Sequence, residues 1–169
     1  SILSKGLHVG GNLILCGTEI TSLPEGIDVG KNLDLSHCNK FKDYPKTLLH
    51  IKGHLECLNC LELLSLPDHL QVDGDLNLVA CPKFEYLPKH LVVGRNLSMY
   101  GSEKIVSLNA NLTVKGRLSL AGFANGATFY ICKQLRTLSN NITIGGSLIL
   151  NKSSELISLG DNISIGGDA

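Results

Sequence analysis

The chain has 169 residues, with 15 basic and 15 acidic side chains and therefore no net charge at neutral pH. That balance argues against a protein that binds nucleic acid by neutralising phosphates, and against a basic surface that attaches to membranes. The length suits a single domain, and no apolar stretch reaches the roughly 18 residues that would predict a membrane-spanning helix.

Eight copies of one short pattern organise the chain. Each copy reads apolar-x-apolar, two turn residues of which at least one is glycine, one polar residue, and then Leu-x-apolar. A fixed period of this kind is typical of a solenoid, whose coils each pack only on their neighbours. The copies occupy residues 7–15, 27–35, 49–57, 70–78, 91–99, 112–120, 142–150 and 163–169, the last being incomplete.

Alternation inside each copy predicts two short strands per coil. In the second copy, Leu33 and Leu35 are expected to face the core and Asp34 the solvent, because successive side chains of a strand point to opposite sides. Ile27 and Val29 are expected to do the same in the strand that precedes the glycine turn. We therefore predict a core of stacked Leu, Ile and Val side chains, and no confident helix anywhere in the chain.

The spacing of the coils is nearly constant. The apolar residues that close successive coils recur every 21 or 22 residues, except for one interval of 30 between Leu108 and Leu138. That interval indicates an insertion of nine residues, which we place in a loop over 121–133. Phe123 is expected to fill the inward site nine residues after Val114, whereas Phe129 and Tyr130 are candidates for a projecting anchor.

Each coil turns a corner after this closing residue. The first four corners carry proline, which fixes φ and lacks an N–H, so the later corners, with Asn109, Ser139 and Gly160, are expected to be looser. The corner ends at a residue type that accepts positive φ readily. His69 and His90 stand there, and we interpret them as turn residues rather than metal ligands or catalytic bases. The column is Gly26, His69, His90, Asn111, Asn141 and Asn162.

The six cysteines are interpreted as structural. Cys57-x-x-Cys60 resembles half of a zinc site, but Cys57 occupies a core position and no second ligand pair follows at a suitable spacing. We therefore expect free buried thiols, no metal and no cofactor. Three of them belong to a column of small residues that faces inward: Thr18, Cys38, Cys60, Cys81, Ser102 and Ser153.

The stretch Leu13-Ile-Leu-Cys-Gly-Thr-Glu-Ile-Thr-Ser-Leu-Pro24 resembles the repeat unit of bacterial leucine-rich repeats. Leu33-Asp-Leu-Ser-His-Cys38, followed by Tyr44-Pro45, matches the same Leu-x-Leu core. The resemblance implies a mostly β solenoid. It would be a right-handed superhelix of about eight 21-residue repeats with a parallel sheet on its concave side. The whole chain, 1–169, would be one such domain and part of a longer protein. The alternative is a three-sided parallel β-helix, with three equal sheets and little curvature.

The Pro-containing repeats, with their Val-Gly-Gly-x-Leu-x-Leu run, resemble the repeat domains of type III secreted effectors of enteric pathogens. This resemblance implies a non-enzymatic scaffold that binds a host protein through its concave face. It would be made in the bacterial cytoplasm and secreted into the host cell. Two alternatives remain open: a structural or prophage-derived repeat protein without a specific partner, and the targeting domain of an enzyme whose catalytic part lies elsewhere. The oligomeric state is left open.

Outward residues of the Leu-x-Leu strands are the candidate binding residues. They include an acidic cluster around Asp34 and Glu56 and an apolar stripe of Leu58, Val79 and Tyr100. Exposed apolar patches and aromatic side chains usually mark contacts with a partner. Asp34 and Glu56 lie on adjacent strands, but an open, wet sheet does little to shift a pKa, so no catalytic residue is expected. The predicted contacts are Asp34, Glu56, Leu58, Asp75, Val79, Tyr100 and Arg117 on the concave face and Phe129 and Tyr130 on the insertion.

Overall fold

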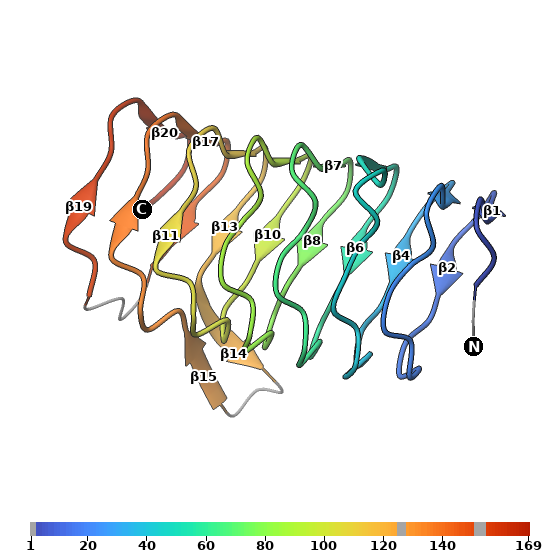
Figure 1. Cartoon of the computed structure of the whole chain (residues 1–169). Helices are drawn as coiled ribbons and strands as arrows, with labels where there is room; N and C mark the ends of the chain where they lie inside the picture. The colour runs from blue at the N-terminus through green and yellow to red at the C-terminus, as the bar shows by residue number, and fades with distance from the viewer. Residues whose placement is uncertain (1–2, 125–127, 151–154) are drawn as a thin grey trace.

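The structure, a computed structural model, describes residues 3–124, 128–150 and 155–169, and the side chains of 123–130 lie outside the description. The coils stack in sequence order, with the two ends of the chain at opposite ends of an elongated body (Figure 1). The described residues form only strands, bridges, turns and bends, without a helix. The prediction of a mostly β solenoid is confirmed. We number the coils 1 to 8 after the eight copies of the pattern.

The Leu-x-Leu segments form the first face, a parallel sheet of seven strands among the described residues. The sheet is in register with the repeat: Leu33 pairs with Leu13 on one side and with Leu55 on the other. Its strands are β2 (Leu13–Ile14), β4 (Leu33–Asp34), β6 (Leu55–Glu56), β8 (Leu76–Asn77), β10 (Leu97–Ser98), β13 (Leu118–Ser119) and β18 (Leu148–Ile149).

The apolar-x-apolar segments form the second face. A two-stranded and a six-stranded parallel sheet follow one another there, separated between coils 2 and 3, where the spacing is one residue longer. The strands are β1 (His8–Val9), β3 (Asp28–Val29), β5 (His50–Ile51), β7 (Gln71–Val72), β9 (Val92–Val93), β12 (Thr113–Val114), β17 (Ile142–Ile144) and β20 (Ile163–Ile165).

The third face carries strands only toward the C-terminal end. They form a three-stranded parallel sheet of β11 (Ser107–Leu108), β16 (Thr137–Leu138) and β19 (Ser158–Leu159), while the described coils nearer the N-terminus contribute one isolated bridge. Two long sheets and a short third one differ from the single dominant sheet expected of a leucine-rich repeat. In this respect the stack is closer to the three-sided alternative.

Proline explains why the third sheet stops. The N–H of Ser139 donates to the carbonyl of Leu108 at 3.2 Å, and that of Gly160 to Leu138 at 2.7 Å. The equivalent residues of coils 2 to 4 are prolines, which have no N–H to donate. Two of the three later corners therefore bond to the coil before them, contrary to the expectation of looser packing, and at the third the side chain of Asn109 donates to Leu87.

The positive-φ prediction at the corners is confirmed. His69 and His90 have φ values of 62° and 57°, and the three later asparagines lie between 57° and 61°. The two imidazole rings stack on each other with centroids 4.8 Å apart. They serve as turn residues, as the sequence indicates. A second positive-φ column at the end of the first face, which includes His37, Asn59 and Ala80, was not predicted.

Inward leucines fill the core as predicted. Leu33, Leu55, Leu76, Leu97 and Leu118 are fully buried, and each contributes roughly 1.5–3 kcal/mol by leaving water. Two phenylalanines, Phe41 and Phe84, are also fully buried and close the core beside the third face. Core residues of the two end coils are only partly buried, because each of those coils has a neighbour on one side alone.

The inward column of small residues is a ladder of hydrogen bonds between coils. In coils 2 to 6 the member donates its S–H or O–H to a backbone carbonyl of the preceding coil, whereas Thr18 of coil 1 lies 3.6 Å from the sulfur of Cys38 and Ser153 lies outside the described residues. Cys60 reaches Leu35 at 3.1 Å and Ser102 reaches Leu78 at 2.9 Å. Burial raises the pKa of the last thiol, Cys132, to about 12, so it stays protonated and able to donate. The remaining members are Cys38, which donates to Leu15, and Cys81, which donates to Cys57.

The insertion is a hairpin rather than a loop. Its antiparallel strands β14 (Ala121–Ala124) and β15 (Thr128–Ile131) project from the side of the stack (Figure 1). Cys132 donates its N–H to Leu120 at 3.0 Å, as Cys38 does to Leu35, so the nine residues are inserted within an ordinary turn. Cys132, not Phe123, therefore takes the inward site.

Replacing Ser102 by alanine is expected to lower the free energy of unfolding by roughly 1–2 kcal/mol, because the buried carbonyl of Leu78 loses its donor. Ser102→Cys should cost less, since thiols fill the same site in other coils. Urea unfolding followed by circular dichroism measures both variants. Equal stability of Ser102→Ala and the wild type would contradict a role for the ladder.

Candidate interaction surfaces

The polar residue before each Leu-x-Leu strand joins one coil to the next. The side-chain oxygen of Asn32 accepts the N–H of His54 at 2.8 Å, and the oxygen of Asn96 accepts the N–H of Arg117 at 2.9 Å. Asp75 does the same for the N–H of Asn96 at 2.9 Å. Asp75, a predicted contact residue, is thus engaged in holding the stack together, which reduces what its carboxylate can offer a partner.

Asp34 and Glu56 lie side by side on β4 and β6, as predicted. The Asp34 carboxylate accepts the N–H of Ser36 at 2.9 Å and so caps its own turn. Partial burial raises the pKa of Glu56, and the nearby charge of Asp34 adds to the rise, while a hydrogen bond with Asn77 opposes it. These two carboxylates remain the acidic part of the first face.

The apolar stripe predicted on the first face is largely covered. Val79 is only 2% exposed, so its place among the contact residues is wrong. Leu58 and Tyr100 are half-buried, and a Cβ added to Gly122 would lie 2.9 Å from the Tyr100 ring. The start of the hairpin therefore packs against the stripe, which the strand period alone could not reveal.

The other predicted contact residues are Arg117 on the first face and Phe129 and Tyr130 on the insertion. Arg117 keeps an exposed side chain at the edge of the first face, available to a partner as expected. Phe129 and Tyr130 belong to β15, but their side chains lie outside the described residues.

Exposed apolar side chains gather instead along the third face. Leu64, Tyr86 and Val106 are 43%, 52% and 48% exposed, and they come from three successive coils. Ile157, further along the same face, is 78% exposed. Ion pairs between neighbouring coils flank this row: Lys40–Glu19 at 2.6 Å, Lys83–Glu62 at 2.6 Å, Lys104–Glu85 at 3.1 Å and Lys133–Glu103 at 3.1 Å.

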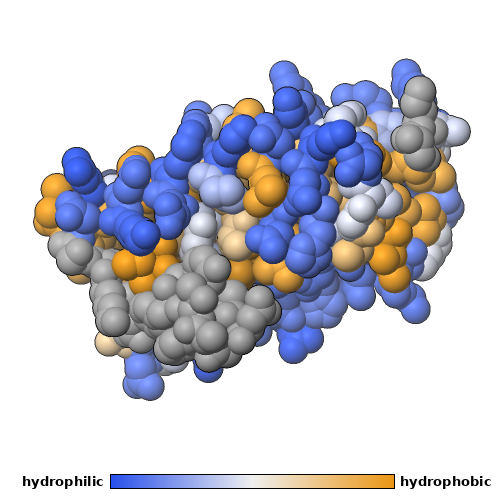
Figure 2. Space-filling view, turned by 90° about the horizontal axis from the view of Figure 1, so that it is seen from below, coloured by the Kyte–Doolittle hydropathy of each residue, from blue (hydrophilic) through white to orange (hydrophobic). Residues whose placement is uncertain are grey.

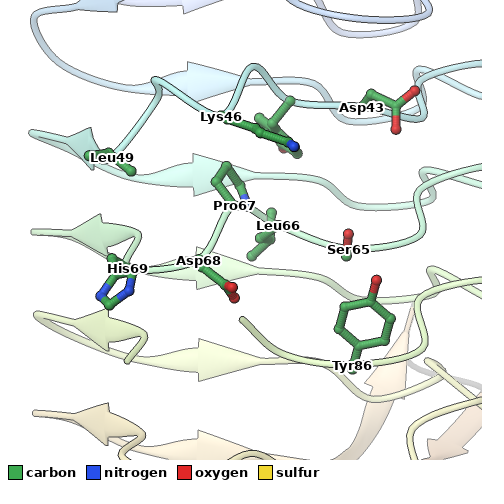
Figure 3. A pocket seen from close by; sticks show the side chains of 10 residues that line it. Asp43, Lys46, Leu49, Ser65, Leu66, Pro67, Asp68, His69 and Tyr86 are labelled. Carbon is green, nitrogen blue, oxygen red and sulfur yellow. The ribbon is translucent and has the colours of Figure 1, made fainter. Parts of the chain in front are cut away.

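An open groove of about 580 Å³ lies on the third face across coils 2 to 4, where the strand ladder is interrupted. Its lining includes the apolar residues Leu49, Leu66 and Pro67, with Asp68 next to Pro67 on the same coil and Tyr86 on the next one (Figure 3). The groove thus combines apolar contact area with a phenol and a carboxylate.

The floor of the groove is firmly held. Tyr44 packs edge-on against the buried Phe41, with ring centroids 4.9 Å apart, and its hydroxyl lies 2.9 Å from the sulfur of Cys57. Burial raises the pKa of the Tyr44 hydroxyl well above its usual value, so the group stays neutral. A partner would meet a preformed surface here rather than one that must order on binding.

Metal sites and membrane-spanning helices are two other features that the described residues could contain. Over the described ranges, no group of three or more His, Cys, Asp or Glu side chains is placed to hold a metal ion. Nowhere in these ranges does a helix have the length and hydrophobicity to cross a bilayer. Comparisons of the chain with protein-family models, curated proteins and solved structures found no match.

The third face escaped the sequence analysis for a definable reason. The outward orientation of Tyr86 does not follow from strand alternation, because the buried Phe84 and Leu87 are three residues apart. The resemblance to leucine-rich repeats places the partner on the Leu-x-Leu strands instead. The interrupted ladder, which opens the groove, depends on contacts between coils.

Proposed function

We propose that this protein is a non-enzymatic scaffold that binds a protein partner through its third face. The observation that carries the proposal is the pair of exposed side chains Tyr86 and Val106, which come from adjacent coils and lie next to the groove over coils 2 to 4. Apolar side chains aligned on a repeat surface usually mark a contact, and tyrosine is enriched among the residues that dominate binding energy.

The chemistry of this face favours a protein over other partners. The chain has no net charge, and the Lys and Glu residues that flank the apolar row are paired with each other, so little positive charge remains for phosphates. A firm apolar strip with a polar rim is the usual composition of a protein interface. The first face, with Glu56 and Arg117, is the second candidate surface.

The resemblance to secreted effectors of enteric pathogens supports a partner from a host cell and a bacterial origin with secretion. It concerns the repeat pattern and does not select among host proteins. A structural or prophage-derived protein without a specific partner and the targeting domain of a larger enzyme remain the competing functions.

Affinity capture from host-cell lysate with three immobilised forms of the protein tests the proposal. The forms are the wild type, the third-face variant Tyr86→Ser with Val106→Ser, and the first-face variant Glu56→Gln with Arg117→Gln. All four side chains lie outside the buried core, so both variants should unfold close to the wild-type temperature. We expect a protein retained by the wild type and the first-face variant to be at least tenfold depleted with the third-face variant.

Depletion with the first-face variant alone would transfer the binding site to the Leu-x-Leu strands. Identical captured proteins for all three forms would contradict a scaffold that binds through either face.

A further inference from the structure

A row of polar side chains on the first face joins each coil to the next through a backbone N–H. In coils 1 to 5, the side chain just before the Leu-x-Leu strand accepts the N–H of the corresponding residue in the following coil. The donor–acceptor distances lie between 2.8 and 3.1 Å, and the five acceptors are Asn12, Asn32, His54, Asp75 and Asn96. The row therefore runs without a break from coil 1 to coil 6.

His54 differs from the other members of the row in its acceptor atom. The side-chain oxygens of Asn and of ionised Asp keep their lone pairs at neutral pH, whereas a histidine ring nitrogen accepts a hydrogen bond only when it carries no proton. The Nδ1 of His54 accepts the N–H of Asp75 at 3.0 Å, so in this arrangement the ring is neutral and its proton is on Nε2. Histidine is the side chain whose charge ordinarily changes between about pH 5 and 8. This bridge, between coils 3 and 4, is thus the one that mild acid removes.

The same nitrogen also faces a carboxylate. The Nδ1 of His54 lies 3.0 Å from the Oδ2 of Asp75, the residue whose N–H it accepts. A protonated Nδ1 has no lone pair for that N–H, and its charge pairs with Oδ2 instead. Coil 5 holds the carboxylate in place, because its Oδ1 accepts both the backbone and the side-chain N–H of Asn96 at 2.9 Å. Asp75 thus offers two partners to one nitrogen, and the proton on that nitrogen selects between them.

The ring is confined by coil 4. The His54 side chain is 32% exposed, and a Cβ on Gly74 would lie 2.9 Å from its Nδ1. Glycine at this turn therefore gives the imidazole its room. Since the ring is held against the turn, Nδ1 stays beside Asp75 in both protonation states.

Charged groups of both signs surround the ring. The carboxylates of Asp75 and of Glu56, which follows on the same strand segment, favour the protonated form. Asp34 of coil 2 lies beside Glu56 and adds to their negative charge. The cations of the adjoining turns oppose protonation: Arg95 of coil 5, which lies 3.8 Å from the Asp75 carboxylate, and Lys31 of coil 2.

Two other histidines pair with carboxylates but hold no backbone group. His8 bonds to Asp28 and His50 to Asp73, both at 2.8 Å and through side chains alone. Protonation there charges an exposed pair and releases no N–H. Hydrophilic side chains are spread along the whole length of the face shown in Figure 2, and water screens charges in such places. His54 is therefore the histidine whose protonation changes how two coils are joined.

We propose that His54 is a pH-sensitive joint between coils 3 and 4. At neutral pH the ring joins the coils through the N–H of Asp75. As the pH falls and the ring takes up a proton, it joins them through the Asp75 carboxylate and the N–H is released to water. The first sheet stays paired, because the N–H of Leu55 still donates to the carbonyl of Asp75 at 2.9 Å. The turn of coil 4 loosens while the stack remains folded.

Amide hydrogen exchange of the full chain, followed by NMR at about pH 8 and about pH 5.5, tests the joint. After correction for the intrinsic exchange rates, the protection of the Asp75 N–H should fall about tenfold at the lower pH, as expected for the loss of one hydrogen bond. The N–H groups of Asn32 and Arg117 have amide oxygens as acceptors in the same row, so their protection should stay constant. An equal fall at all three would mean that acid loosens the whole stack, which overturns the inference.

His54→Asn places at this position the residue type of Asn12, Asn32 and Asn96, whose oxygen accepts at either pH. In this variant the protection of the Asp75 N–H should be the same at both pH values. His50→Asn is the matched control, because it removes a histidine of the same coil that bonds only to a carboxylate, and the fall at Asp75 should persist. The inference is overturned if Asp75 protection in the wild type does not change with pH. It is overturned equally if the fall survives in His54→Asn or disappears in His50→Asn.

Discussion

Replacing Phe84 by alanine is expected to lower the free energy of unfolding by about 3–5 kcal/mol. Phe84 is fully buried next to the third face and is one of the two largest side chains in the core. The third face has no strand ladder in this coil, so the segment is held to the stack by packing of the ring together with the N–H of Glu85, which donates to Leu64 at 3.1 Å. Denaturant unfolding followed by circular dichroism measures the loss.

Tyr86→Ala is the control for this experiment. It removes a ring of similar size two residues away, where the side chain is 52% exposed, and should cost well under half as much. Equal losses for the two variants would mean that Phe84 does not close the core as described.

Gly145→Val is expected to be the second most damaging single change, at about 3 kcal/mol. The added Cβ would lie 2.2 Å from the carbonyl oxygen of Lys115, and both atoms belong to backbone that is fixed by parallel ladders. Coils 6 and 7 would have to separate at this turn. Thermal unfolding of the purified variant gives the measurement.

Gly10→Val provides the comparison at the same position of the repeat. No atom lies within 4 Å of the Cβ it adds, so its unfolding temperature should stay close to that of the wild type. A Gly145→Val protein as stable as Gly10→Val would show that the turns do not rest on each other as the structure describes.

The repeat pattern was sufficient to predict the solenoid, the inward leucines and the turn histidines. Each of these depends on the alternation or conformation of a single coil, as in Leu33-Asp34-Leu35 or at His69. Features that depend on two coils at once were missed. The missing N–H of Pro45 and Pro67 is evident from the sequence, but the interruption of the third sheet that results from it depends on how neighbouring coils pair.

The contact residues predicted on the first face also depend on packing between coils, which the pattern of one coil does not reveal. Val79 follows the outward alternation of its strand and is therefore expected in solvent, but its side chain is only 2% exposed. The nine extra residues were counted correctly from the spacing. Spacing alone could not decide whether Phe123 or Cys132 continues the inward ladder. The Cys132 N–H donates to the carbonyl of Leu120, so the turn forms between these two residues and the hairpin is inserted between them.

The column of inward thiols has a practical consequence for studying this protein in solution. Five of the six cysteines are buried, whereas Cys16, in the first coil, is exposed. Thiol reagents react with accessible thiolates, so a maleimide dye or a nitroxide attaches at this one position of the folded wild-type chain. A spectroscopic reporter can thus be placed near the N-terminal end of the solenoid without removing any native residue.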